Sequence, residues 1–132
     1  TGHLCLATLH ANNAAETLDR IINMFPRDQH SQIFLDLSQY LKAIAAQRLV
    51  FGKDGKRLAA VEVMLNTPHI SELVKKGDVS GIKEAIVQSS ERGVQSFDHA
   101  LYELVKQGRV ELEEALNNAD SRTNLEAKIN FG

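Results

Sequence analysis

The chain has 132 residues, of which 43% are apolar and 24% charged, and its formal net charge is -2. This apolar content suffices for a buried core, whereas a nearly neutral chain has no general attraction for a polyphosphate backbone, so no nucleic-acid partner is expected. The single cysteine, Cys5, excludes an internal disulfide and a tetracysteine zinc site, and no apolar run approaches the ~18 residues of a transmembrane helix, so direct membrane insertion is not expected.

The N-terminal segment carries a strand pattern followed by a helix pattern. Residues 3–9 form a short, mostly apolar run, which predicts a buried strand of the kind found in parallel sheets covered by helices. Apolar residues then recur at spacings of three and four over 14–25, which predicts a helix that Pro26 ends. Because the chain begins at Thr1 without methionine and enters this strand pattern at once, we expect a fragment or a processed chain.

The next segments predict a helix followed by a β-hairpin. The helical spacing returns over residues 28–46. Segments 47–51 and 57–65 have the character of strands, and the turn formers at 52–56 join them. In the second strand, alternate residues fall on opposite faces: one face carries Ala59, Val61, Val63 and Leu65, and the other carries Ala60, Glu62 and Met64.

From Thr67 onward the sequence predicts helices separated by caps and glycines. Thr67 is expected to cap the first helix, which ends at Gly77, and Asp78 and Ser96 are expected to cap the next two. A short fourth helix is predicted over 111–118. The polar tail from residue 120 is expected to fray.

No complete catalytic or metal-binding motif is present. Gly55-Lys56 is followed by Arg57 instead of Ser or Thr, so it does not form a phosphate-binding loop and is interpreted as a solvated turn. The spacing of His3, Cys5 and His10 does not place all three on one face of a strand, so no metal site is expected. Cys5 lies in an apolar run, where a thiol is usually an inert small hydrophobe.

The segment 8–13 stands apart from the routine scaffold. It places Thr8, His10 and two asparagines where an apolar strand leads into a helix, and ligands of open α/β sheets bind outside the carboxyl ends of strands. A histidine there could hydrogen-bond a phosphate or orient a water molecule. The alternative is that these polar residues only cap the helix.

Several blocks of the sequence together resemble a known family. Residues 1–14, followed by Asp19-Arg20-Ile21-Ile22 and Phe25-Pro26, resemble the histidine box of the secretion and type IV pilus motor ATPases. The resemblance continues in order through 47–50, 57–64, 66–74 and 95–101. It therefore covers essentially the whole chain.

Departures within the resemblance favour one branch of the family. Where twitching-motility retraction ATPases carry an A-I-R-N-L-I-R-E motif, residues 69–76 have Ser71 in place of the central arginine and Lys76 at the acidic end. This degenerate form, and the tail at 114–121, resemble the PilU type of the PilT/PilU family more than the PilT type. The lack of a tetracysteine module also favours the retraction branch.

The resemblance implies an α/β fold that comprises the last strands of a RecA-like P-loop ATPase core, over residues 1–66, and a helical C-terminal subdomain, over 67–132. The family's phosphate loop (Walker A), aspartate box, catalytic glutamate and Walker B strand lie outside this sequence. ATP and Mg²⁺ are accordingly expected to bind the intact parent protein, and the chain alone is expected to be inactive.

The resemblance also implies roles for individual residues. His10 would couple the γ-phosphate to the subunit interface, with Thr8 at a matching position of the catalytic segment. His3 and Arg20 would lie at the nucleotide or subunit interface. Partner contacts are expected on the helix after Thr67, at Ile70, Glu72, Leu73 and Lys75.

The expected parent is a cytoplasmic homohexamer, peripheral to the inner membrane, that drives pilus retraction. Its partners would be inner-membrane proteins of the pilus machinery and a paralogous motor ATPase. The alternative is a non-catalytic regulatory helical module that acts through protein partners.

Overall fold

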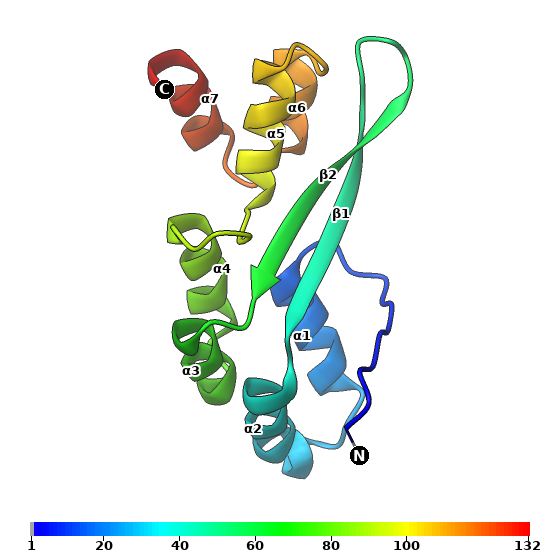
Figure 1. The fold of residues 1–132 in the computed structure, drawn as a ribbon, viewed down its shortest axis with the longest axis vertical. Helices are drawn as coiled ribbons and strands as arrows, with labels where there is room; N and C mark the ends of the chain where they lie inside the picture. The colour runs from blue at the N-terminus through cyan, green and yellow to red at the C-terminus, as the bar shows by residue number, and fades with distance from the viewer. Residues whose placement is uncertain (1) are drawn as a thin grey trace.

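A long antiparallel β-hairpin runs through the molecule, and the helices pack along it in groups (Figure 1). The structure is a computed structural model and describes residues 2–132. The elements are, in chain order, α1 (Ala14–Asn23), the short 3-10 helix η1 (Arg27–Gln29), α2 (His30–Tyr40), β1 (Ala43–Phe51), β2 (Arg57–Leu65), α3 (Pro68–Lys76), α4 (Val79–Gln88), α5 (Phe97–Lys106), α6 (Leu112–Asn118) and α7 (Arg122–Phe131).

The hairpin is longer than the sequence pattern predicted. Its register runs from Ala43 opposite Leu65 to Phe51 opposite Arg57, so β1 begins four residues before the predicted start at residue 47. The predicted helix over 28–46 is correspondingly wrong in its last part, since α2 ends at Tyr40. Strand pairing supplies backbone partners to residues 43–46 that a helix end would leave unsatisfied, and this outweighs the helical spacing of their side chains.

The predicted helix caps are confirmed in the C-terminal half. Thr67 Oγ1 accepts a hydrogen bond from the Ile70 N–H at 3.3 Å, Asp78 Oδ1 accepts from the Gly81 N–H at 2.9 Å, and Ser96 Oγ accepts from the His99 N–H at 3.3 Å. Gly77 ends α3 in the left-handed region, at φ 67°. Each cap of this kind typically stabilises a helix by ~1 kcal/mol.

Two hydrophobic clusters form along the hairpin. One joins the hairpin to α5, α6 and α7 and includes Val50, Ala60, Phe97, Leu101, Val110, Ala115 and Leu125. The other joins the end of β2 to α1, α3 and α4 and includes Leu18, Met64, Ile70, Val74, Ile82 and Ile86. On the buried face of β2, Ala60 belongs to the first cluster and Met64 to the second, and Glu62 lies between them at 4% exposed. A carboxyl group therefore occupies the point where the clusters meet.

The predicted buried strand over 3–9 is not formed. Residues 2–12 belong to no helix or strand, and Leu4 and Leu6 are 77% and 89% exposed. Within the described residues the sheet has only β1 and β2, so no further strand lies beside this segment to pair with its backbone. Cys5 is exposed for the same reason, which corrects its interpretation as a buried hydrophobe.

The prediction that the tail frays from residue 120 is also wrong, because this region forms α7. Ser121 Oγ caps the helix by accepting from the Asn124 N–H at 3.4 Å, and Leu125 is 1% exposed in the first hydrophobic cluster. Asp98 on α5 accepts hydrogen bonds from the backbone N–H groups of Asp120 and Ser121, at 2.7 and 3.0 Å. One buried leucine and these long-range hydrogen bonds dock α7, although the polar composition of this segment does not predict a docked helix. Among the described helices, none is long and apolar enough to cross a membrane.

Candidate functional site at the start of helix α1

The polar segment before α1 ends in a reciprocal cap. Asn13 Oδ1 accepts a hydrogen bond from the Glu16 N–H at 2.7 Å, and Glu16 Oε2 accepts one from the Asn12 N–H at 2.9 Å. Glu16 also accepts from the guanidinium of Arg20 one turn later, at 2.6 Å. The Asn12 N–H and the Arg20 guanidinium lower the pKa of Glu16, so this carboxylate stays charged where it complements the positive end of the helix dipole.

Glu62 of β2 also binds the junction between segment 8–13 and α1. Its Oε1 accepts a hydrogen bond from the Ala14 N–H at 2.8 Å, across 48 positions of sequence. Burial raises the pKa of the Glu62 carboxyl above its ordinary value, and the Asp120 carboxylate adds to the rise. The Ala14 N–H, Arg48 and Lys83 oppose this rise without cancelling it.

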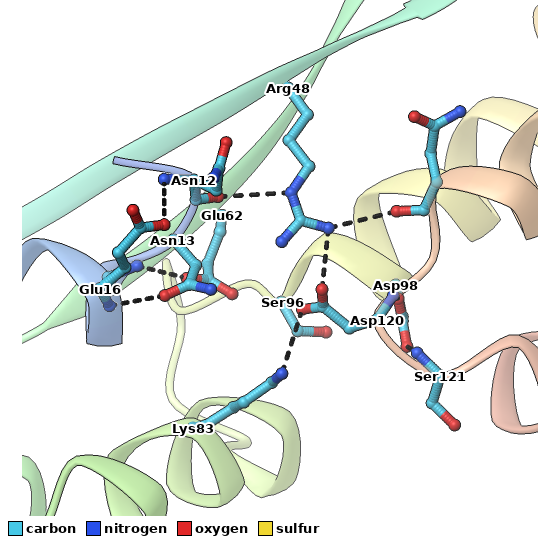
Figure 2. Close-up of polar contacts among 12 residues, drawn as sticks. Asn12, Asn13, Glu16, Arg48, Glu62, Lys83, Ser96, Asp98, Asp120 and Ser121 are labelled. Carbon is cyan, nitrogen blue, oxygen red and sulfur yellow. Dashed lines mark hydrogen bonds and ion pairs between the residues drawn. The ribbon is translucent and has the colours of Figure 1, made fainter. Parts of the chain in front are cut away.

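Arg48 of β1 connects the junction to the C-terminal helices. Its Nε donates to the Asn12 carbonyl at 3.3 Å, one terminal nitrogen donates to the Asn118 carbonyl at 3.2 Å, and the same nitrogen lies 2.8 Å from Asp120 Oδ1. The guanidinium carbon also lies 4.0 Å from the ring centroid of Phe97. Figure 2 shows the guanidinium between Asn12 and Asp120, with Lys83 of α4 reaching the other Asp120 oxygen at 4.0 Å. We call Arg48, Glu62, Lys83 and Asp120 the Arg48 cluster.

The catalytic and interface residues that the family resemblance implies lie before α1 or on it. The side chains of Thr8 and His10 are exposed in the segment that leads into α1, and His3 is exposed farther towards the N-terminus. Arg20 is exposed on α1 and forms its ion pair with Glu16. The catalytic and interface roles of these residues stay predictions.

The partner-contact surface predicted on α3 needs one correction. Ile70 is 3% exposed and packs in the second hydrophobic cluster, because it lies on the buried face of α3. Glu72 and Lys75 are exposed on the same helix, and Leu73 is half-buried. Of the four residues predicted to contact a partner, Glu72 and Lys75 are accessible, and Leu73 is accessible in part.

Sequence reasoning did not single out the Arg48 cluster. A signal was present in β2, where the charged residue Glu62 stands between Ala60 and Met64 on one face of a strand. Such a residue is either on a solvated face or buried with partners. Arg48 and Asp120 carried no local signal, because they meet only after the hairpin and α7 have docked.

The carboxylates of this arrangement bind backbone N–H groups and neighbouring cations. Glu16, Glu62 and Asp120 accept hydrogen bonds or ion pairs from neighbouring groups, and none of them faces a nucleophile in the contacts described. In the part of the chain that the structure describes, no group of three or more histidine, cysteine or acidic residues could hold a metal ion. The Arg48 cluster contacts segment 8–13 at its C-terminal end, through the Asn12 carbonyl.

The sequence and the fold have counterparts among known proteins. Residues 1–117 match the family described as Type II/IV secretion system protein, and the chain belongs to this family. It is 53% identical over 133 aligned residues to the type IV pilus ATPase PilU of Pseudomonas aeruginosa, and this match covers 100% of the chain and 35% of PilU. It is 35% identical over 119 residues to the retraction ATPase PilT of the same organism, covering 90% of the chain and 35% of PilT.

Solved structures agree with this assignment. A crystal structure of the pilus retraction motor PilT with bound ADP superposes with a TM-score of 0.82 at 32% identity, over 96% of this chain and 35% of PilT. The ATPase DotB of Legionella pneumophila, at 19% identity and a TM-score of 0.64 over 80% of this chain and 29% of DotB, shares the fold. The chain thus spans about a third of the length of the curated relatives it matches. The predicted resemblance and the α/β fold, that of the C-terminal portion of a RecA-like ATPase, are confirmed.

Proposed function

We propose that the whole protein containing these residues is an ATPase that drives type IV pilus retraction, and that this region couples its nucleotide site to the C-terminal helices. The observation that carries the proposal is the 53% identity to PilU over the full length of the chain. The likeness to PilT, whose structure holds ADP, supports nucleotide binding by the whole protein. Its finer resemblance is to the PilU type, through residues 69–76.

In this proposal His10 and Thr8 are the residues of this chain that meet the nucleotide. An exposed imidazole can donate a hydrogen bond to a phosphate oxygen, and a phosphate nearby favours its protonated form. ATP with Mg²⁺ supplies the phosphoryl group, whose transfer depends on positioning and charge stabilisation by groups outside these residues. The role of His10 is then to register whether the γ-phosphate is present.

The assembly is part of the same proposal. The whole protein is a cytoplasmic homohexamer, peripheral to the inner membrane, in which His3 and Arg20 lie at or near the interface between subunits. Glu72, Leu73 and Lys75 of α3 contact inner-membrane proteins of the pilus machinery or a paralogous motor ATPase. The exposure of Glu72 and Lys75 supports this placement.

ATP hydrolysis by the whole protein and by the 132-residue chain, assayed in parallel, tests the proposal. We expect Mg²⁺-dependent turnover by the whole protein and none by the chain, since the chain has no phosphate-loop sequence. Hydrolysis by the pure chain would contradict its proposed inactivity. A whole protein that neither binds nor hydrolyses ATP would overturn the motor function and favour the alternative, a regulatory module that acts through protein partners.

A further inference from the structure

A single arginine joins three parts of the molecule that are distant in sequence. The Arg48 guanidinium reaches the Asn12 carbonyl before α1, the carboxylate of Asp120 between α6 and α7, and the face of Phe97 on α5. Figure 2 shows the contacts to Asn12 and Asp120 diverging from the one side chain of β1. Each contact uses a different edge or face of the guanidinium, so a single planar group satisfies all of them.

These contacts differ from an ordinary surface ion pair. The side chains of Arg48 and Asp120 are 21% and 20% exposed, and the Phe97 ring under the guanidinium is fully buried. Exposed pairs commonly contribute little because long side chains must be ordered in water. Here packing on Phe97 already orders the arginine, so its hydrogen bonds can fix the position of the backbone they reach.

The junction is held from two sides. Arg48 donates to the carbonyl of Asn12, and Glu62 accepts from the N–H of Ala14, so the contacts bracket the cap residue Asn13. His10 lies just before this bracket in the sequence. The backbone on both sides of Asn13, to which segment 8–11 leads, is therefore held by β1 and β2.

The C-terminal helices control one of these two contacts. Asp120 orients Arg48, and its backbone N–H donates to Asp98 Oδ1 on α5 at 2.7 Å. Lys83 of α4 lies 4.0 Å from the second oxygen of Asp120, so it shares this carboxylate with Arg48. A shift of the α6–α7 connection would thus reach Asn12 through one side chain.

We propose that Arg48 and Asp120 are positioning residues, which hold the nucleotide-coupling segment around His10 in place and make it responsive to the α6–α7 connection. This inference rests on the proposed ATPase function for its effect on turnover. The mechanical part, control of order at the start of α1, stands without it.

The test uses the whole protein with Arg48→Lys, Asp120→Asn and the double variant. The matched control is Glu113→Gln. It removes the exposed ion pair, 3.2 Å long, between Glu113 of α6 and Arg122 of α7, and it leaves the contacts of Arg48 intact. Lysine keeps the charge of Arg48 but cannot stack flat and donate in several directions. Hydrogen exchange of the peptide covering residues 10–18 is measured first, with ATP turnover second.

We expect the two single variants to speed exchange of this peptide by about tenfold, and the control to leave it unchanged. The double variant should be no worse than Arg48→Lys alone, because both substitutions break one linkage. In turnover, kcat should fall several-fold while KM for ATP stays within about twofold, the pattern of a lost transition-state arrangement.

Each contrary result has a distinct meaning. Unchanged exchange at 10–18 in both single variants, with α5 protected as in the wild type, would overturn the positioning role. Faster exchange with wild-type kcat would overturn the link to turnover. A wild-type protein without ATPase activity would remove the proposed function, and the exchange data would still decide whether Arg48 and Asp120 position the junction.

Discussion

At the scale of single residues, Glu62 shows how a charged group can organise a core. It is 4% exposed between two hydrophobic clusters, and it accepts the Ala14 N–H that would otherwise lack a partner at the start of α1. Burying a carboxyl without partners is costly. The hydrogen bond from Ala14 and the nearby charges of Arg48 and Lys83 offset part of that cost, and the pKa of Glu62 nevertheless stays raised.

This raised pKa predicts how stability depends on pH. Folding favours the protonated form of Glu62, so its contribution is full below the unfolded-state pKa and is lost as the pH rises through the higher pKa of the folded state. Glu62→Gln keeps an oxygen acceptor for the Ala14 N–H and removes the charge. We expect the variant to be more stable than wild type at neutral pH, with the gap narrowing as the pH falls.

Urea unfolding of wild type and Glu62→Gln across a pH series measures this effect. Asp120, Arg48 and Lys83 face Glu62 and are the same in both proteins, so the difference between the two curves isolates the carboxyl group. Curves that run parallel from acidic to neutral pH would show that Glu62 does not titrate with folding.

At the scale of elements, local sequence signals predicted several helix ends and the hairpin turn. Thr67, Asp78 and Ser96 cap helices as their positions indicated, and Gly77 ends α3 in the conformation that glycine favours. The turn after β1 was equally visible from its glycines. In all these cases the deciding hydrogen bonds join residues within a few positions of each other.

Elements that depend on contacts between residues distant in sequence were not predicted correctly. Residues 3–9 carry a strand pattern but have no strand to pair with among the described residues. Helix α7 has a weak apolar face and depends on Leu125, Asp98 and the cap at Ser121 for docking. The Arg48 cluster is invisible for the same reason, since its members come from β1, β2, α4 and the α6–α7 connection.

The docking of α7 can be tested by removing its one buried side chain. Leu125→Ala should reduce the free energy of unfolding by about 2–5 kcal/mol, the usual cost of deleting a buried leucine side chain. The control is Phe131→Ala at the end of the same helix, where the ring is 91% exposed and almost no effect is expected. Equilibrium unfolding in urea compares the two. Equal, small effects would mean that α7 does not pack as described.

At the scale of the whole molecule, the hairpin acts as the common support for both ends of the chain. Its buried face joins the cluster built on α1, α3 and α4 to the cluster built on α5, α6 and α7. Figure 1 shows these helices as groups along the hairpin. The junction before α1 and the α6–α7 connection meet over the hairpin through Arg48. In the proposed function, a change at segment 8–13 would reach the C-terminal helices through Arg48.

In the proposed function, this route begins at His10 of a pilus motor ATPase. The most direct measurement is steady-state ATP turnover by the whole protein as wild type, as His10→Ala and as His69→Ala, a control that removes an exposed histidine on α3. We predict that His10→Ala lowers kcat by about tenfold or more, equivalent to ~1.4 kcal/mol of transition-state stabilisation, while His69→Ala hydrolyses ATP like the wild type. Wild-type turnover in His10→Ala, with hydrolysis confirmed in the unmodified protein, would overturn the proposed coupling role of His10.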